Sequence, residues 1–387
     1  MRCLFWPESF QVGIRMDDQT IAALCCPSCR GPLGSQSFDS ASATSKGDLV
    51  VEELSNGILT CDACRVMFPV QNGIPVLLVF ATNCHTVFSK KHHKSLDRFS
   101  KYKFPDGRPE QGERYVQNSF TDQWEALQED ELTYLYTDDD LVRLHRDVWL
   151  QWDEPPEDVR QVLNLGVGYG KETEILSRII PKARIYGVDL NLSLLGRTAA
   201  FKACNVQFVI ASVFHLPFRD GHFDLAYSQG VLHHTYSTKA AYSALQRQVR
   251  SGGYLFVWLY AAEDPFVPRG MVGFIAKMRW LIETFIRPPI SMLPSSLRKP
   301  VLTGLAAVYH PMILARVRHR KKWTFKHSKH LTFDHLGPRY AHRHAFNEVI
   351  EWFEDDGFEI RVQSPSRYRE AFGKRLFGVG LIGRRVR

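Results

Sequence analysis

The stretch Val162–Leu190, VLNLGVGYGKETEILSRIIPKARIYGVDL, predicts the fold of the chain. A short apolar strand leads into a loop with Gly166, Gly168 and Gly170, a helical run follows, and a second strand ends in Asp189. Glycines let the backbone approach a ligand closely, and the start of a helix offers free N–H groups. A carboxylate about 20 residues after the loop can accept hydrogen bonds from ribose hydroxyls. The stretch therefore predicts a β–loop–α–β unit that binds a nucleoside.

The spacing of the glycines argues against a dinucleotide. Dinucleotide sites use G-x-G-x-x-G, whereas this loop reads G-x-G-x-G and has Lys171 where the third glycine would stand. No phosphate-binding loop of the type G-x-x-x-x-G-K-[ST] is present either. A nicotinamide-dependent oxidoreductase is therefore an alternative that the loop disfavours.

Five stretches in order carry a resemblance to a known family. They are the glycine-loop stretch, GVDLNLSLL, VIASVFHLPFRDGHFDLAYSQGVLHHT, LQRQVRSGGYLFVW and FNEVIEWFEDDGFEI. The chain resembles the class I S-adenosylmethionine-dependent methyltransferases, in particular the small-molecule group that includes the ubiquinone and menaquinone enzymes. The resemblance implies a doubly wound α/β domain over residues 159–387, with a mostly parallel, seven-stranded sheet. It also implies transfer of a methyl group from S-adenosylmethionine.

The same resemblance implies roles for individual residues. The glycines would wrap the methionine end of the cofactor, Asp189 would hold the ribose, and the adenine would lie beside the strand that ends before Ser212. The implied cofactor contacts are Asn164, Gly166, Gly168, Gly170, Asp189, Leu190, Ser212, Val213 and Gln229.

Two of these positions depart from the family pattern. Asn164 stands where the family often has an acid near the methionine amino group, and Ser212 stands where an aspartate usually meets the adenine amino group. Both changes remove negative charge from the surroundings of a cationic cofactor. They raise the alternative of a noncatalytic protein that binds S-adenosylmethionine or acts as a scaffold.

His233 and His234 are the candidate catalytic residues, because they lie beside the transferred methyl group in the family that the chain resembles. An oxygen acceptor must lose a proton during methyl transfer, and histidine can accept one near neutral pH. The alternative is that one of the two imidazoles forms a structural hydrogen bond.

Residues 21–80 are predicted to form a zinc ribbon. Cys26 and Cys29 form one C-x-x-C pair and Cys61 and Cys64 form another, a set of four thiolates that suits tetrahedral Zn²⁺. Structural thiols or a redox pair are the alternatives, and Cys25 could replace a neighbour as a ligand. The pairs CPSC and CDAC, with the tail FPVQNGIPVLL, resemble the zinc-ribbon activator subunit of tRNA methyltransferases.

Three further segments surround these two units. We expect residues 1–20 to be a disordered lead-in, residues 81–118 to be a linker, and residues 119–158 to form N-terminal helices that cover the cofactor. The spacing of Leu141, Leu144 and Val148 predicts an amphipathic helix. The acidic run 138–140 favours its N-terminus.

Residues 266–344 are expected to form a helical insert that carries 15 Lys and Arg residues but only two acids. Because the whole chain has a formal net charge of +8, the positive charge is concentrated in this insert. The insert is also apolar, so it suits a cap over the acceptor side, a peripheral contact with anionic membrane, or a pocket for a lipid-linked acceptor. No RNA-binding motif is present, so we do not expect nucleic acid as a partner, although RNA methylation remains an alternative function.

The chain has 387 residues and the composition of a globular protein. No apolar run reaches the roughly 18 residues that a membrane-spanning helix needs, and the apolar stretch near Met1 is too short for a signal-peptide core. We therefore expect a cytoplasmic protein, with peripheral contact with a membrane through the insert as the further option. The expected acceptor is a small molecule, a glycan or a lipid-linked compound.

Overall fold

The computed structural model describes residues 16–39, 44–46, 49–51, 54–125, 137–152, 154–196, 205–262, 281–316, 323–362, 365–372 and 378–386. Residues 1–15 of the expected lead-in lie outside this part of the chain. So do residues 266–280 and 317–322 of the expected insert.

A single sheet of eleven strands runs through the molecule, in the order β1-β4-β5-β6-β9-β8-β7-β10-β11-β13-β12. Its last seven strands form the doubly wound, mostly parallel sheet that the sequence predicts, with only β13 running antiparallel to its neighbours. These strands are β7 (Gln161–Leu165), β8 (Arg184–Asp189), β9 (Val206–Ala211), β10 (Phe223–Gln229), β11 (Val249–Leu259), β12 (Phe358–Val362) and β13 (Val379–Arg385).

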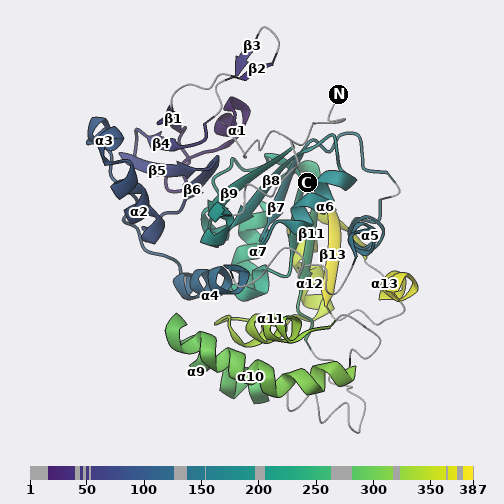
Figure 1. Ribbon diagram of the computed structural model, residues 1–387. Coiled ribbons are helices and arrows are strands. Elements are labelled where there is room, and N and C mark those ends of the chain that lie inside the picture. The colour runs from purple at the N-terminus through teal and green to yellow at the C-terminus, as the bar shows by residue number, and fades with distance from the viewer. Residues whose placement is uncertain are drawn as a thin grey trace.

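The strands of the ribbon extend the same sheet, a pairing that was not predicted from the sequence. β6 pairs in parallel with β9, with Val76 opposite Ile210 and Leu77 opposite Ala211. Figure 1 shows the ribbon strands continuing the sheet beyond β9. They are β1 (Gly34–Ser37), β4 (Gly57–Cys61), β5 (Val66–Gln71) and β6 (Ile74–Leu77), and a separate hairpin joins β2 (Thr44–Lys46) to β3 (Leu49–Val51).

Two hydrophobic cores cover the two faces of the sheet, because side chains alternate along each strand. Leu163 and Tyr186 lie in one core, with α7 and α12, whereas Val162 and Ile185 lie in the other, with α6 and α13. The first core also contains Phe68 of the ribbon. The helices named here are α6 (Lys171–Ile179), α7 (Thr238–Gln246), α12 (Phe346–Asp355) and α13 (Pro365–Phe372).

The start of the ribbon is more ordered than we expected. Met16 is fully buried and exchanges backbone hydrogen bonds with Leu54, and Asp17 accepts from Arg184 at 2.6 Å. Helix α1 (Asp18–Ala23) follows directly. The expectation of a disordered lead-in is therefore wrong for residues 16–20, since an apolar contact and an ion pair hold them.

The segment 81–118 is not a plain linker, because much of it is helical. It contains α2 (Asn83–Lys91), α3 (His93–Leu96) and a 3₁₀ turn (Asp97–Phe99). Phe88 of α2 packs on Ile58 of the ribbon in a small core of its own. The segment looked like a linker because most of its residues are charged or polar, but a few apolar residues, such as Phe88, pack against the ribbon.

Residues 113–150 contain three further helical elements. α4 (Glu113–Glu125) begins inside the expected linker, and α5 (Asp138–Arg143) continues as a π-helical turn over Leu144–Leu150. A capping box confirms the predicted start of α5, since the Thr137 hydroxyl accepts from the Asp140 N–H at 3.1 Å and the Asp140 carboxylate accepts from the Thr137 N–H. Short 3₁₀ turns follow the strands at Leu192–Gly196, Val213–His215 and Leu232–His234.

The described part of the insert is helical, as predicted. It contains a π-helical turn (Ile282–Ile286), α9 (Arg287–Ser291), α10 (Ser295–Arg316) and α11 (Phe325–Leu336). In Figure 1, α9 and α10 form the outermost layer, and α11 lies between α10 and the rest of the molecule. Among the described residues, no helix combines the length and the apolar character needed to cross a membrane.

Candidate functional site

A cavity of about 360 Å³ lies at the carboxyl ends of the central strands. It is placed where the strand order reverses, between β7 and β10, which is the usual ligand position in open α/β sheets. Residues that follow β7, β8, β9 and β10 all line it. Side chains of α4 and α11 complete the lining.

The glycine loop after β7 lines this cavity in a conformation that requires glycine. Gly166, Gly168 and Gly170 have φ angles of +83°, +52° and +95°. A Cβ atom at Gly166 would lie 2.0 Å from Val231, and one at Gly168 would lie 2.5 Å from the ring of Trp124. The loop therefore packs directly against two other walls of the site. Gly170 itself caps α6 and does not line the cavity.

Asp189 stands at the end of β8 and lines the cavity beside the loop. Its Oδ2 accepts from the Gly168 N–H at 2.7 Å, and its Oδ1 accepts from the Asn191 N–H at 2.8 Å. Burial raises the pKa of the Asp189 carboxyl, and these backbone hydrogen bonds oppose that shift. The carboxylate lines the cavity, and a carboxylate can accept hydrogen bonds from ligand hydroxyls such as those of a ribose.

Helix α4 covers the cavity along its whole length. Gln117 donates to the Leu190 carbonyl at 2.9 Å, which fixes the first half of the helix above the end of β8. In the second half, Phe120 contacts His234 with ring centroids 5.1 Å apart, and Trp124 contacts His330 at 5.6 Å. The covering helices that we predicted over 119–158 thus begin earlier, at Glu113.

The end of β9 does not present Ser212 to the cavity. Its hydroxyl accepts from the Phe214 N–H at 3.1 Å, and the residue is buried, while Val213 and Phe214 line the cavity instead. A carboxylate from α4 lies there too. Glu113 is buried, lines the cavity and hydrogen-bonds the Ser212 side chain. Burial raises the pKa of Glu113, and the hydrogen bonds from Ser212 and the Glu110 N–H partly oppose this.

Asn164 also lies outside the lining of the cavity and joins β7 to α6. It is fully buried in β7 and donates to the Thr173 hydroxyl of α6 at 2.9 Å, and it does not line the cavity. Its Oδ1 has no partner among the described residues. Glu172, two residues after Gly170, does line the cavity, and burial raises the pKa of its carboxyl to about 8.

The two candidate catalytic histidines have different surroundings. His233 is fully buried, stacks on Tyr260 with centroids 3.9 Å apart, and does not line the cavity. His234 lines the cavity, and its Nδ1 lies 2.8 Å from the Tyr340 carbonyl oxygen. Because a carbonyl oxygen can only accept, Nδ1 carries the hydrogen and Nε2 holds the free lone pair. Burial lowers the pKa of His234, which favours this neutral form.

A carboxylate of the insert faces the same end of the cavity. Asp334 of α11 accepts from the Tyr260 hydroxyl at 3.0 Å and from Gln123 at 3.4 Å. Burial raises the pKa of Asp334, but nearby histidines, among them His234 and His330, outweigh it and lower the pKa overall. This end of the cavity therefore combines a charged carboxylate with imidazoles.

Sequence reasoning found part of this set. Of the predicted contacts, the cavity is lined by Gly166, Gly168, Asp189, Leu190, Val213, Gln229 and His234, but not by Asn164, Gly170, Ser212 or His233. It missed Glu113, Glu172 and Asp334. Only Glu172 carried a local signal, since it lies in the first turn of the helix after the glycine loop.

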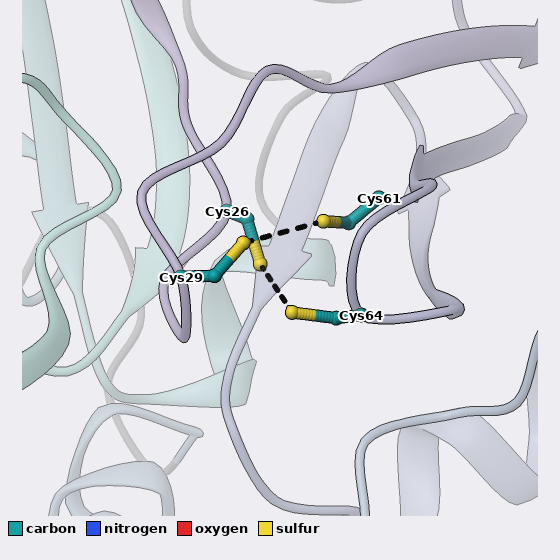
Figure 2. A group of neighbouring side chains, drawn as sticks. All are labelled: Cys26, Cys29, Cys61 and Cys64. Carbon is teal, nitrogen blue, oxygen red and sulfur yellow. Dashed lines mark hydrogen bonds between the residues drawn. The ribbon is translucent and has the colours of Figure 1, made fainter.

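The four cysteines of the ribbon converge, as Figure 2 shows, although they come from two distant turns. Their Sγ atoms all lie within 4.8 Å of one another, with Cys29 3.5 Å from Cys61 and Cys26 4.0 Å from Cys64. Tetrahedral zinc with bonds of about 2.3 Å needs sulfur atoms about 3.8 Å apart. Cys25 is buried next to the cluster but is not part of it.

Comparisons with known proteins match both units. The family described as a methyltransferase domain matches residues 163–257, and the family described as a Trm112p-like protein matches residues 17–73. A complex containing the Haloferax volcanii Trm112 methyltransferase activator is structurally similar, with 13% identity and a TM-score of 0.37, covering 72% of this chain and 99% of that one.

Two curated proteins are similar to the central part of the chain. A trans-aconitate 2-methyltransferase of Deinococcus radiodurans is 30% identical over 110 residues, or 28% of this chain and 42% of that protein. A malonyl-(acyl-carrier protein) O-methyltransferase of Legionella pneumophila is 31% identical over 98 residues, or 25% and 34%. The chain thus spans less than half the length of either relative. The matches confirm both expected resemblances: the chain contains a methyltransferase domain joined to an N-terminal Trm112p-like domain.

Proposed function

We propose that this protein transfers a methyl group from S-adenosylmethionine to a small or lipid-linked acceptor. The observation that carries the proposal is the cavity at the reversal of the strand order, where the glycine loop and Asp189 lie side by side. A nucleoside with a charged tail fits this arrangement better than a dinucleotide does, because the loop lacks the third glycine at Lys171.

The cofactor would lie along the ends of three neighbouring strands. Its methionine part would meet the glycine loop after β7, its ribose would meet Asp189 after β8, and its adenine would meet Val213 and Phe214 after β9. This order follows from the order of the strands, since methionine, ribose and adenine are joined in a line.

Two glutamates would take the place of the acids that are missing at Asn164 and Ser212. Glu172 is largely neutral at pH 7 in the free protein, because burial raises its pKa to about 8, and a cationic cofactor beside it would favour its ionised form. Glu113 lies at the adenine end and can accept from the adenine amino group. Glu172 lies in the first turn after the glycine loop and would face the cationic methionine part. The departures from the family pattern are then replacements, which favours an active enzyme over a noncatalytic scaffold.

The acceptor would occupy the other side of the cavity, between β10, α4 and α11. There His234 Nε2 can take a proton from an acceptor hydroxyl, and Asp334 would stabilise the imidazolium that forms. Phe120 and Trp124 exclude water from this side, so the reacting groups meet in a dry site. Methyl transfer itself is an in-line displacement, for which alignment matters most.

The four ribbon thiolates would hold one zinc ion, in line with the separations of their sulfur atoms. The ion would supply structure, since it joins two turns that have little core of their own. Cys26 and Cys61 are part of the core shared with the methyltransferase domain, so the ion would also stabilise that domain.

The deciding measurement is calorimetric titration with S-adenosylhomocysteine. We expect binding by the wild type, a loss of about 100-fold in Asp189→Ala, and a loss of about tenfold in Glu113→Gln, since hydrogen bonds to charged groups contribute about 1.5–3 kcal/mol. Glutamine keeps the Glu110 N–H contact, so helix α4 should keep its start. Glu110→Gln is the control, because Glu110 does not line the cavity. Equal affinity of Glu113→Gln and wild type would contradict the role at the adenine.

The affinity for S-adenosylmethionine should depend on pH through Glu172. Because its pKa is raised to about 8, the group is largely neutral at pH 7 and becomes a carboxylate above pH 8. The attraction for a cationic cofactor should therefore grow between pH 7 and pH 9, by about tenfold in wild type relative to Glu172→Gln. Comparing the two proteins at each pH removes the titration of the ligand's own amino group. Glu174→Gln, which changes a carboxylate outside the cavity, should behave like the wild type.

Methyl transfer can be followed with labelled S-adenosylmethionine and separate fractions of small molecules, lipids and RNA. We expect label in the small-molecule or lipid fraction, and a decrease of about 10²–10⁴-fold in His234→Asn if the acceptor is a hydroxyl. This variant should still bind S-adenosylhomocysteine, because His234 lies on the acceptor side. Full activity of His234→Asn would remove the imidazole from the mechanism, and label in RNA alone would favour the alternative function.

The purified protein should contain one zinc ion, measurable by elemental analysis. Cys29→Ser should lower the metal content and lower the melting temperature by at least about 5 °C. Unfolding should stay a single transition, because the ribbon and the methyltransferase domain share a core. Cys25→Ser is the matched control and should retain zinc, since Cys25 lies outside the cluster. Two separate transitions would show that the shared core does not couple the units.

A further inference from the structure

Exposed apolar side chains are concentrated on one part of the molecule. Among the described residues, twelve large apolar side chains are exposed, and nine of them lie between Phe285 and Phe325. They lie in the π-helical turn before α9, directly after α9, along α10 and at the start of α11, and α9 and α10 form the outermost layer in Figure 1. Such a concentration on one layer marks an interaction surface rather than scattered surface residues.

Helix α10 is apolar on both of its faces. Its inner face is covered, since Leu302 and Ala306 are buried and Leu302 packs with Phe333 and Leu336 of α11. Its outer face carries Leu297, Val301, Val308 and Met312, which are exposed by 56%, 40%, 68% and 60%. At 3.6 residues per turn these four lie within about 60° of one another around the axis. We call this set the outer stripe of α10.

Only weak polarity interrupts the outer stripe. The exposed residues between its members include Pro300, Gly304, Ala307 and Pro311, none of which has a polar side chain. A helix that is apolar all round is normally buried on all sides. Among the described residues, this chain covers the inner face of α10 and leaves the outer face exposed, so the outer face is available to an occupant from outside.

The charge of the surrounding segments indicates what that occupant is. The described residues 281–316 and 323–344 contain eight Lys and Arg but only two acids, Glu283 and Asp334. Arg298 and Lys299 pair with Asp122 of α4, and Asp334 lines the cavity, which leaves six basic residues and one acid, Glu283, in these segments. Lys299 lies about 170° around the axis of α10 from the outer stripe, whereas Lys326 is exposed at the start of α11. A second copy of this chain would bring the same positive charge and be repelled, whereas an anionic surface would be attracted.

We propose that the outer stripe of α10 docks on the surface of an anionic lipid bilayer. The helix would lie in the plane of the interface, with the stripe among the acyl chains and the basic residues at the headgroups. It spans 22 residues, or about 33 Å. This inference goes beyond the proposed methyl transfer, and vesicle binding can be measured without any acceptor.

The docked helix also contacts the helix that covers the cavity. Asp122 of α4, the helix that covers the cavity, accepts from Arg298 of α10 at 2.8 Å and from Ser295 at 2.6 Å. Arg298 and Asp122 are both largely buried, with side chains 4% and 13% exposed. The stripe and the cover of the cavity therefore belong to one packed unit.

The test is flotation of the full chain with vesicles of phosphatidylcholine containing about a third of phosphatidylglycerol, compared with pure phosphatidylcholine. We expect binding to the anionic vesicles, weaker binding at high salt, and at least about tenfold weaker binding by Val308→Glu, because a charge replaces an exposed apolar group that docking would bury. Val87→Glu is the matched control: Val87 is exposed by 62%, on α2, beside the ribbon and away from α10 in Figure 1. It should bind like the wild type.

Several outcomes would overturn the proposal. No flotation with anionic vesicles, or equal binding by Val308→Glu and the wild type, would exclude the bilayer as the occupant. Light scattering of the free protein gives the third outcome, since a dimer that Val308→Glu dissociates would assign the stripe to a second copy. Binding of RNA that Val308→Glu abolishes, without flotation, would assign it to nucleic acid.

Discussion

The pairing of β6 with β9 is the contact on which the rest of the structure depends. Without it, β9 would be the edge of the methyltransferase sheet and would leave a row of unpaired backbone groups. Only two residue pairs form the ladder, so the buried side chains around Phe68 must hold the register. β9 then leads into Val213 and Phe214, which form one end of the cavity. The folding of the ribbon that contains the cysteine cluster is thus linked to the shape of the cavity.

The position of Glu113 shows how the covering helix and the site are linked. Its carboxylate accepts from the Glu110 N–H at the start of α4, and this is a contact that a surface residue could provide equally well. It is nevertheless buried beside Ser212, where an ionised group is costly unless it is hydrogen-bonded. Two polar contacts leave acceptor positions of the carboxylate unused. A ligand with an amino group is the partner that would compensate for this burial, and adenine offers one.

The sequence was sufficient where the chemistry is local. The glycine loop and Asp189 lie in one short pattern, and they line the same cavity. The two cysteine pairs lie in short patterns of their own, and their sulfur atoms converge in a separate cluster. The family resemblance also implied a seven-stranded sheet, but no local pattern predicts that a ribbon strand pairs with β9. Glu113 and Asp334 were missed for the same reason, since each reaches the cavity from a helix distant in sequence. The sequence around Ser212 and Asn164 likewise did not indicate that the carboxyl groups of Glu113 and Glu172 line the same cavity.

The outer stripe of α10 bears on the nature of the acceptor. A helical segment that is apolar all round does not reveal in sequence which face will be inside, and burial of Leu302 settles this for α10. An acceptor dissolved in water would gain nothing from the exposed stripe, which carries a cost in solubility. An acceptor held in a bilayer would be delivered beside α10 and α11, and α11 carries Asp334 at the acceptor end of the cavity. Since the ion pair between Arg298 and Asp122 joins α10 to the helix that covers this cavity, the stripe argues for a lipid-linked acceptor over a free metabolite.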